Sequence, residues 1–270
     1  MATLLEIIKG RRSVRTFDGR PLRPEDREKL AAFIPGVTNP FGVPVELVLL
    51  DAEEHGLSSP VITGEKMYAT GRVPKVPYAD VAFGFSFEKL VLYAWSLGIG
   101  TTWMGGTMKR DTFARAVGLK DGERIPCVSP LGYPAAKMSV RETVMRKGCG
   151  ADSRMSAEKI FFEGNLETPL AGEKKEALGD LIEMVRWAPS AINRQPWRVI
   201  VTDAGIHFYE KKDKGFVSDA VGDMQKIDIG IALCHFVMGL EEQGKTPSVT
   251  VSDPGIAVPD NIVYIATVQA

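Results

Sequence analysis

The spacing of hydrophobic and polar positions along the chain predicts a mixture of helices and short strands. A helix is expected over residues 4–9. Thr3 and Glu6 can form its capping box, and Gly10 can take the left-handed conformation that ends a helix. A second helix should begin at Pro24, since proline is favoured in a first turn. Apolar runs predict strands over residues 45–50, 127–133, 197–201 and 261–268.

Two further segments are apolar on nearly all sides. Residues 80–97, with Asp80 as the expected cap, end before Gly98, and residues 228–243 end before Gly244. A helix that is hydrophobic all round is buried all round. These two helices are therefore expected to pack against each other inside the molecule.

The remaining pattern is less regular. Residues 173–188 have the helical spacing of an amphipathic helix, whereas residues 55–77 are rich in Gly, Pro and Ser and read as a long loop or lid.

Several features recur in the same order in both halves. The loop over residues 35–39 has a counterpart over residues 189–193, with Pro and Asn four positions apart in each. Alignment of the two buried helices at their ends places Gly84 opposite Gly230. This order indicates an internal duplication.

Composition excludes several classes of protein. The formal net charge of −1 over 270 residues provides no general attraction to nucleic acid or to an anionic membrane. No apolar run is long enough to cross a bilayer, and the first residues do not follow the pattern of a secretory signal, so a cytoplasmic protein is expected. Three widely spaced cysteines argue against a disulfide framework, and no metal-binding motif is present.

Three segments could carry chemistry. The first is RRSVR, in which the guanidinium groups and the serine hydroxyl could bind phosphate oxygens, or simply form a solvated basic turn. The second is APSAINRQPWR, whose polar side chains suit the edge of a flat heterocycle but could equally shape a helix-to-strand connection. The third is GTTWMGG, whose glycines could admit a planar ring or close a turn.

Together and in this order the segments resemble the nitroreductase family. RRSVRTF, LGIGTTWMGG, LGYP and APSAINRQPWRVI each resemble a family segment, and the last is the most specific. The resemblance implies an α+β fold with three layers, α-β-α. In ordinary members all four segments lie in one half-sized subunit, and two subunits share two FMN sites.

Here the segments are divided between the halves. RRSVR, GTTWMGG and LGYP lie in the first half, and APSAINRQPW lies in the second. We therefore expect a first lobe over residues 1–150 and a second lobe over residues 151–270, which mimic the family homodimer and share one FMN site. Because the lobes would bury each other's interface, a monomer is expected.

The resemblance also implies which residues bind the cofactor. The phosphate and ribityl chain would be held from the first lobe, the flavin ring would lie near two glycines, and polar groups would reach across from the second lobe. The implied residues are Arg11, Arg12, Ser13, Arg15, Gly105, Gly106, Arg154, Pro189, Ser190, Asn193 and Gln195.

The implied activity is a two-electron transfer. NADH or NADPH would reduce FMN, and a small-molecule acceptor such as a nitroaromatic or a quinone would then be reduced by the flavin. The cofactor performs this chemistry, so no catalytic side chain has to be identified. The alternative is a scaffold that binds flavin weakly or not at all and has lost the reductase activity.

Overall fold

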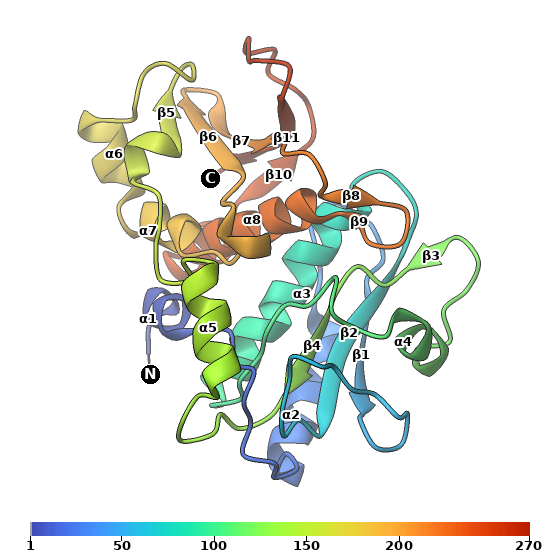
Figure 1. Ribbon diagram of the computed structural model, residues 1–270. Helices are drawn as coiled ribbons and strands as arrows, with labels where there is room; N and C mark the ends of the chain where they lie inside the picture. The colour runs from blue at the N-terminus through green and yellow to red at the C-terminus, as the bar shows by residue number, and fades with distance from the viewer. Residues whose placement is uncertain (1) are drawn as a thin grey trace.

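The computed structural model describes residues 2–270, and two sheets enclose a pair of crossing helices (Figure 1). In the first sheet, β2 is central and pairs antiparallel with the other three strands. The strands of this sheet are β1 (Glu46–Asp51), β2 (Met67–Pro74), β3 (Glu123–Arg124) and β4 (Val128–Leu131).

The second sheet has the strand order β10-β11-β7-β6-β5. All of its pairs are antiparallel except β5 with β6. Its strands are β5 (Phe161–Glu163), β6 (Trp197–Thr202), β7 (Gly205–Lys211), β10 (Ser248–Thr250) and β11 (Ile262–Gln269). A separate small hairpin consists of β8 (Val217–Ser218) and β9 (Gly222–Asp223).

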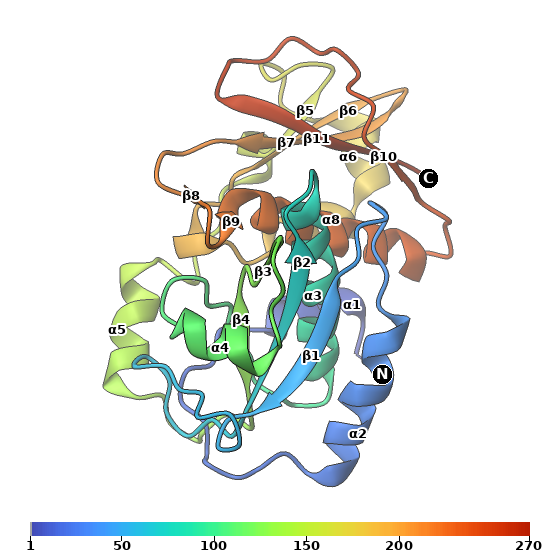
Figure 2. The ribbon, with the colours of Figure 1, turned by 90° about the vertical axis from the view of Figure 1, so that its right-hand side faces the viewer.

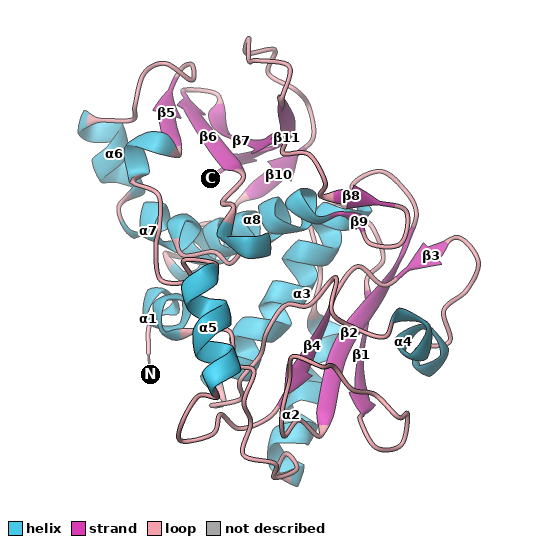
Figure 3. Ribbon diagram, viewed as in Figure 1, coloured by secondary structure: helices cyan, strands magenta, loops and turns pink. Residues whose placement is uncertain are grey.

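The helices surround and separate these sheets (Figure 3). The α-helices are α1 (Leu4–Gly10), α2 (Pro24–Phe33), α3 (Ala79–Ser96), α4 (Arg110–Ala116), α5 (Val140–Gly148), α6 (Gly172–Leu178), α7 (Asp180–Arg186) and α8 (Met224–Glu242). Three short 3₁₀ turns are η1 (Ile34–Gly36), η2 (Ala157–Lys159) and η3 (Ala191–Asn193). None of the helices in residues 2–270 is both long and apolar enough to cross a membrane.

The two apolar helices form the centre of the molecule. α3 packs directly against α8, and both are buried along almost their whole length. Gly84 and Gly230 lie where the two backbones come closest, because a Cβ atom at either position would be 2.1 Å from a carbonyl oxygen of the opposite helix. The predicted packing of these helices is confirmed.

The predicted loop over residues 55–77 is wrong in its second half, which forms the central strand β2. Alternate side chains of β2 serve two cores: Met67 and Ala69 pack with the α3 side, whereas Tyr68 packs on the other side against Phe113 of α4. Gly71 lacks a side chain because a Cβ atom would be 2.9 Å from Leu47. The glycine content of this segment predicts a loop, but Gly71 is present because the close packing of the sheet requires it.

Within residues 2–270, the three-layer α-β-α arrangement is found in the first lobe alone, where α3 and α4 lie on opposite faces of the sheet. In the second lobe, Phe208 of β7 packs against Phe236 of α8 on one face. The other face carries Tyr209 and Tyr264, and Asp253 of a long loop lies close to both. Figure 2 shows loop rather than helix above this sheet. The expected third layer is therefore wrong for the second lobe.

The structure corrects three other predictions, which concern where helices begin and end. The cap of α3 is Tyr78 with a left-handed φ of 63°, not Asp80, whose carboxylate instead pairs with Arg124. Helix α8 starts earlier than predicted, because Asp223 caps it. The single helix expected over residues 173–188 is two helices, α6 and α7, which meet at Gly179 with a φ of 47°.

The lobes have the same order of main elements. In the first lobe the order is α2, η1, β1, β2, α3 and β4, and in the second it is α7, η3, β6, β7, α8 and β11. β2 lies between β1 and β4, just as β7 lies between β6 and β11. The boundary at residue 150 stays a prediction.

Candidate functional site

The arginine-rich segment runs directly alongside the predicted glycine-rich turn. Arg11 closes α1 by donating its backbone N–H to Ile7 O, and Val14 then donates its N–H to Thr101 O at 2.8 Å. Gly100 permits this contact, since a Cβ atom there would be 2.9 Å from the Val14 side chain. RRSVR and GTTWMGG are thus neighbours, and Ser13 pairs with Thr101.

Arg11 is the most buried of these arginines. Its side chain is 4% exposed, and its Nε and Nη1 atoms are buried without a hydrogen-bond partner. Burial lowers the pKa of Arg11; the Glu88 carboxylate opposes this effect, and Arg146 adds to it. Arg11 therefore has donors that lack acceptors.

Arg12 and Arg15 face α5, which lies beside this segment in Figure 1. Arg12 Nη1 lies 3.5 Å from the buried Glu142 carboxylate of α5. Burial lowers the pKa of Arg15, while nearby Glu142 opposes the shift and Arg146 reinforces it. Arg146, in the last turn of α5, is a member of this group that sequence reasoning missed.

Arg154 joins the same group from the start of the second lobe. Burial is the largest cause that lowers its pKa to about 10, and repulsion from Arg11 is the next. Its Nε is also buried without a partner, and its guanidinium carbon lies 4.8 Å from the centre of the Trp187 ring. We call Arg11, Arg15, Arg146 and Arg154 the arginine cluster.

The second-lobe loop contacts the segment that carries Arg154. Asn193 Nδ2 donates to Gly150 O at 2.7 Å and to Ser153 O at 3.1 Å. Gln195 Oε1 accepts the backbone N–H of Met155 at 2.9 Å. Both amides thus position the segment beside the arginine cluster, a role that the sequence did not reveal.

The same loop has an unusual backbone. Ile192, Asn193 and Gln195 all have positive φ values, of 43°, 58° and 51°. Ser190 stabilises the turn because its Oγ accepts the backbone N–H of Gln195 at 2.9 Å. Pro189 begins the loop. Strained non-glycine residues persist only where the surroundings hold them, and they gather at functional sites.

Asp228 connects this loop to α8, since its carboxylate accepts the N–H of Ala191 at 3.1 Å. Complete burial raises the pKa of Asp228 well above its ordinary value.

The α8 start also meets the glycine-rich turn. A Cβ atom on Gly105 would be 3.4 Å from Met224 Sδ, whereas one on Gly106 would meet nothing within 4 Å. The start of α8 therefore lies against the glycine-rich turn of the first lobe.

The glycine-rich turn is also tied to the arginines from behind. Trp103 Nε1 donates to Glu88 Oε2 at 2.9 Å, and Glu88 Oε1 lies 4.0 Å from Arg11 Nε. His235 of the second lobe approaches the same Oε1 at 3.0 Å. Glu88 is fully buried in an apolar helix, which is the signal that could have identified it from the sequence.

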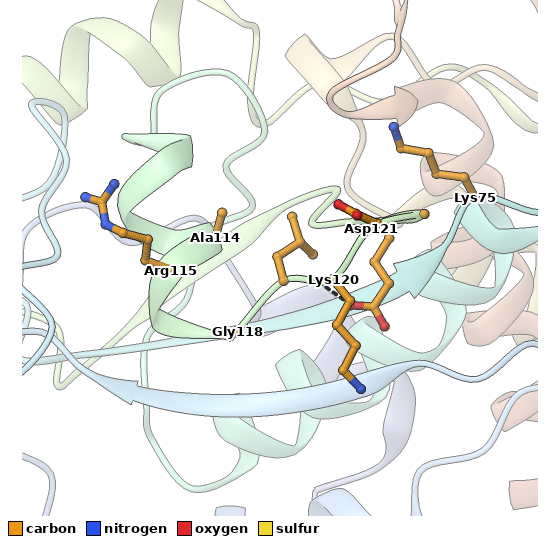
Figure 4. Close-up of a pocket in the computed structure, with 9 residues that line it drawn as sticks. Lys75, Ala114, Arg115, Gly118, Lys120 and Asp121 are labelled. Atoms are coloured by element: carbon orange, nitrogen blue, oxygen red, sulfur yellow. Dashed lines mark hydrogen bonds between the residues drawn. The ribbon is translucent and has the colours of Figure 1, made fainter.

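These donors suit an anion with several oxygen atoms, and phosphate is such an anion. Residues 2–270 contain no group of three or more His, Cys, Asp or Glu side chains placed to hold a metal ion. One surface hollow of about 420 Å³ lies elsewhere, beside α4 and Lys75, and the arginine cluster does not line it (Figure 4).

Comparison with known proteins identifies the family of the chain. Residues 3–240 match the sequence profile of the family described as "Putative TM nitroreductase". The chain belongs to this nitroreductase family. Among curated proteins, none matches the chain.

Solved structures show the fold of this nitroreductase-family protein. A "putative nitroreductase" from Thermotoga maritima is 19% identical with a TM-score of 0.62, and the match covers 97% of this chain and 92% of that one. Smaller proteins match about half of the chain. An "FMN-dependent Nitroreductase" from Clostridium difficile is 14% identical with a TM-score of 0.42, covering 53% of this chain and 95% of that one. A "Putative NADH dehydrogenase/NAD(P)H nitroreductase" from Bacteroides thetaiotaomicron is 19% identical with a TM-score of 0.43, covering 52% and 91%.

Proposed function

We propose that this protein is an FMN-dependent reductase that takes hydride from NADH or NADPH and reduces a nitroaromatic, a quinone or a similar acceptor. The observation that carries the proposal is the arginine cluster at the meeting point of the two lobes. Arg11 and Arg154 contribute three buried nitrogen atoms that lack hydrogen-bond partners. Buried donors normally have partners, so this set fits a phosphate group.

The charges fit one phosphate. Of the carboxylates near the arginine cluster, Glu88 and Glu142 are buried, whereas Asp152, which pairs with Arg146, is 82% exposed. Together with Arg12, the arginine cluster places five guanidinium groups beside these two buried carboxylates. This excess of positive charge favours a dianion such as a phosphate monoester.

We propose the following roles toward FMN. Arg11, Arg15 and Arg154 would bind its phosphate, with Arg146 added to the predicted set. Arg12 and Ser13 would lie beside the ribityl chain, and Gly105 and Gly106 would leave room for the ring. Bound FMN would supply the two-electron chemistry. Pro189, Ser190, Asn193 and Gln195 would act from the second lobe by holding the loop and the Arg154 segment.

We also propose that the two lobes arose by internal duplication and form a pseudo-dimer. The repeated order of elements and the reciprocal contacts of Gly84 and Gly230 support this history. Only one composite site would then keep its arginines.

Visible absorbance of the purified protein tests the proposal first, before and after addition of FMN. Bound flavin that NADH or NADPH bleaches without oxygen, and that an added quinone or nitroaromatic restores, is the expected result. Bound flavin that neither nucleotide reduces would reject the reductase. Absence of flavin binding even with added FMN would instead favour the scaffold that has lost the activity.

A further inference from the structure

Glu88 is a buried carboxylate on which three segments converge. Its side chain has no exposed surface. Trp103 Nε1 donates to Oε2 at 2.9 Å, while His235 Nε2 and Arg11 Nε lie 3.0 and 4.0 Å from Oε1. An unpaired buried carboxylate is strongly unfavourable, so these contacts are what makes its burial possible.

His235 holds Glu88 from the second lobe. His235 Nδ1 lies 2.8 Å from Met184 O, and a carbonyl oxygen can only accept, so Nδ1 carries a hydrogen atom. Nε2 lies 3.0 Å from Glu88 Oε1, so His235 fixes the carboxylate from the second-lobe helix α8.

Arg11 depends on Glu88 for its position. Arg146 and Arg154 both repel its guanidinium group, and burial also disfavours its charge. The Glu88 carboxylate opposes these effects and stabilises the charge of Arg11. Without it, we expect the guanidinium to turn away from the other arginines.

From this geometry we propose that Glu88 is the positioning residue of the phosphate site: held by Trp103 and His235, it keeps Arg11 aimed at the phosphate. The identity of that phosphate as part of FMN rests on the proposed function. In α8 the position equivalent to Glu88, four residues after Gly230, is Cys234. A carboxylate at this position is therefore present in α3 but not in α8.

The variant Glu88→Gln tests the proposal, because glutamine keeps the size and polarity of the side chain but removes its charge. Inorganic phosphate, followed by ³¹P NMR, probes the arginine cluster directly, and FMN and riboflavin are compared by fluorescence. We expect Glu88→Gln to weaken phosphate and FMN binding by about tenfold, equivalent to about 1.4 kcal/mol, and to leave riboflavin binding unchanged.

Glu183→Gln is the matched control. Glu183 pairs with Arg186, which lies near Arg154, so this variant also removes a carboxylate close to the cluster but leaves Arg11 untouched. Simple loss of negative charge would strengthen phosphate binding in both variants. Stronger binding by Glu88→Gln would therefore overturn the positioning role.

A double-mutant cycle separates positioning from general support of the fold. In an Arg11→Ala background, Glu88→Gln should cause no further loss of phosphate affinity, whereas an equal loss in both backgrounds would refute the proposal. If Glu88→Gln does not fold, Trp103→Phe enters the same cycle, because it removes the indole N–H that holds Glu88 and keeps an aromatic ring at that position. If the wild-type protein binds phosphate but not FMN, the proposed function is rejected, and the cycle still decides whether Glu88 positions Arg11. If the wild-type protein binds neither ligand, both the proposed function and the positioning role of Glu88 are rejected.

Discussion

Gly84 of α3 and Gly230 of α8 make reciprocal contacts. A Cβ atom on Gly84 would lie 2.1 Å from Ile227 O, and one on Gly230 would lie 2.1 Å from Val81 O. Each glycine thus meets the residue three positions before the other. A two-fold interface exchanges equivalent contacts in this way, so the pair of contacts supports the proposed pseudo-dimer.

Alanine at Gly84 or Gly230 should therefore destabilise the protein strongly. The atoms in the way belong to backbone, so the helices themselves would have to separate. We expect the free energy of unfolding to fall by roughly 1–3 kcal/mol or more in either variant, as measured by urea denaturation.

Gly36→Ala is the control for this pair. Gly36 has no heavy atom within 4 Å of a Cβ position and no left-handed φ, so alanine should fit there without cost. Equal stability of Gly84→Ala and Gly36→Ala would show that the helices are not in close contact at Gly84.

The sequence predicted the core better than the sheets. Continuous apolar character identified α3 and α8 because burial on all sides leaves a strong local pattern. Strand β2 left no such signal. Its glycine, Gly71, is required by contacts with Leu47 and Phe83, which lie far away in the sequence.

The residues of the candidate site were likewise only partly predictable from the sequence. The arginines at positions 11–15 and the loop at 189–195 were found because they form local motifs. Glu88, Arg146 and Asp228 were missed because each gains its role from partners distant in the sequence. His235 of the second lobe likewise gains its role from a distant partner, because it contacts Glu88 of the first lobe.

Arg11→Ala should weaken FMN binding more than Arg12→Ala does. Arg11 is buried with unpaired donors, whereas Arg12 already pairs with Glu142. Loss of a hydrogen bond to a charged group costs roughly 1.5–3 kcal/mol, so FMN affinity should fall tenfold to more than a hundredfold in Arg11→Ala. Fluorescence titration with FMN measures the effect, and riboflavin, which lacks the phosphate, should bind Arg11→Ala and the wild type alike.

Arg115→Ala serves as the control for the arginine variants. Arg115 lies on α4 beside the surface hollow of Figure 4, and among the described residues its guanidinium group bonds only to Thr112. Its removal should leave FMN affinity unchanged. A similar loss in Arg115→Ala and Arg11→Ala would mean that net charge, not the arginine cluster, governs binding.

Glu210 should make stability depend on pH. Burial, with a smaller contribution from Asp223, raises the pKa of Glu210 from 4.5 to about 7, while Lys212 and Lys226 oppose the shift. Between these pH values the folded protein holds a proton that the unfolded chain releases. The protonated Glu210 therefore stabilises the folded protein fully below pH 4.5, and this stabilisation is lost as the pH rises through about 7. The free energy of unfolding should fall by up to about 1.4 kcal/mol per pH unit in this range.

Urea denaturation of wild type and Glu210→Gln across this range tests the assignment. The variant cannot titrate at this position, so its stability relative to wild type should increase as the pH rises from 4.5 to above 7. Glu167→Gln, a change at an exposed position, should follow the wild-type curve. Parallel curves for all three proteins would contradict a raised pKa at Glu210.

The number of flavins per chain is the sharpest test of the two-lobed site, and we expect one. Asn193 of the second-lobe loop contacts the Arg154 segment, and Arg154 lies close enough to Arg11 of RRSVR for the two guanidinium groups to repel each other. In place of RRSVR the second lobe has Phe161 and Phe162 of β5, and Phe161 is buried. Apolar side chains cannot replace the donors that a phosphate needs. A second FMN would therefore have no phosphate site.

The packing of α3 against α8 also predicts that the site is complete within one chain. α3 and α8 bury each other, so no partner chain is needed to cover either apolar helix. Titration with FMN, combined with light scattering, should give one flavin per 29.5 kDa monomer. Two flavins per chain would mean that the side with Phe161 also binds phosphate. Flavin bound only by a dimer would mean that residues from another chain complete the site, and either result would contradict a composite site formed by the two lobes of one chain.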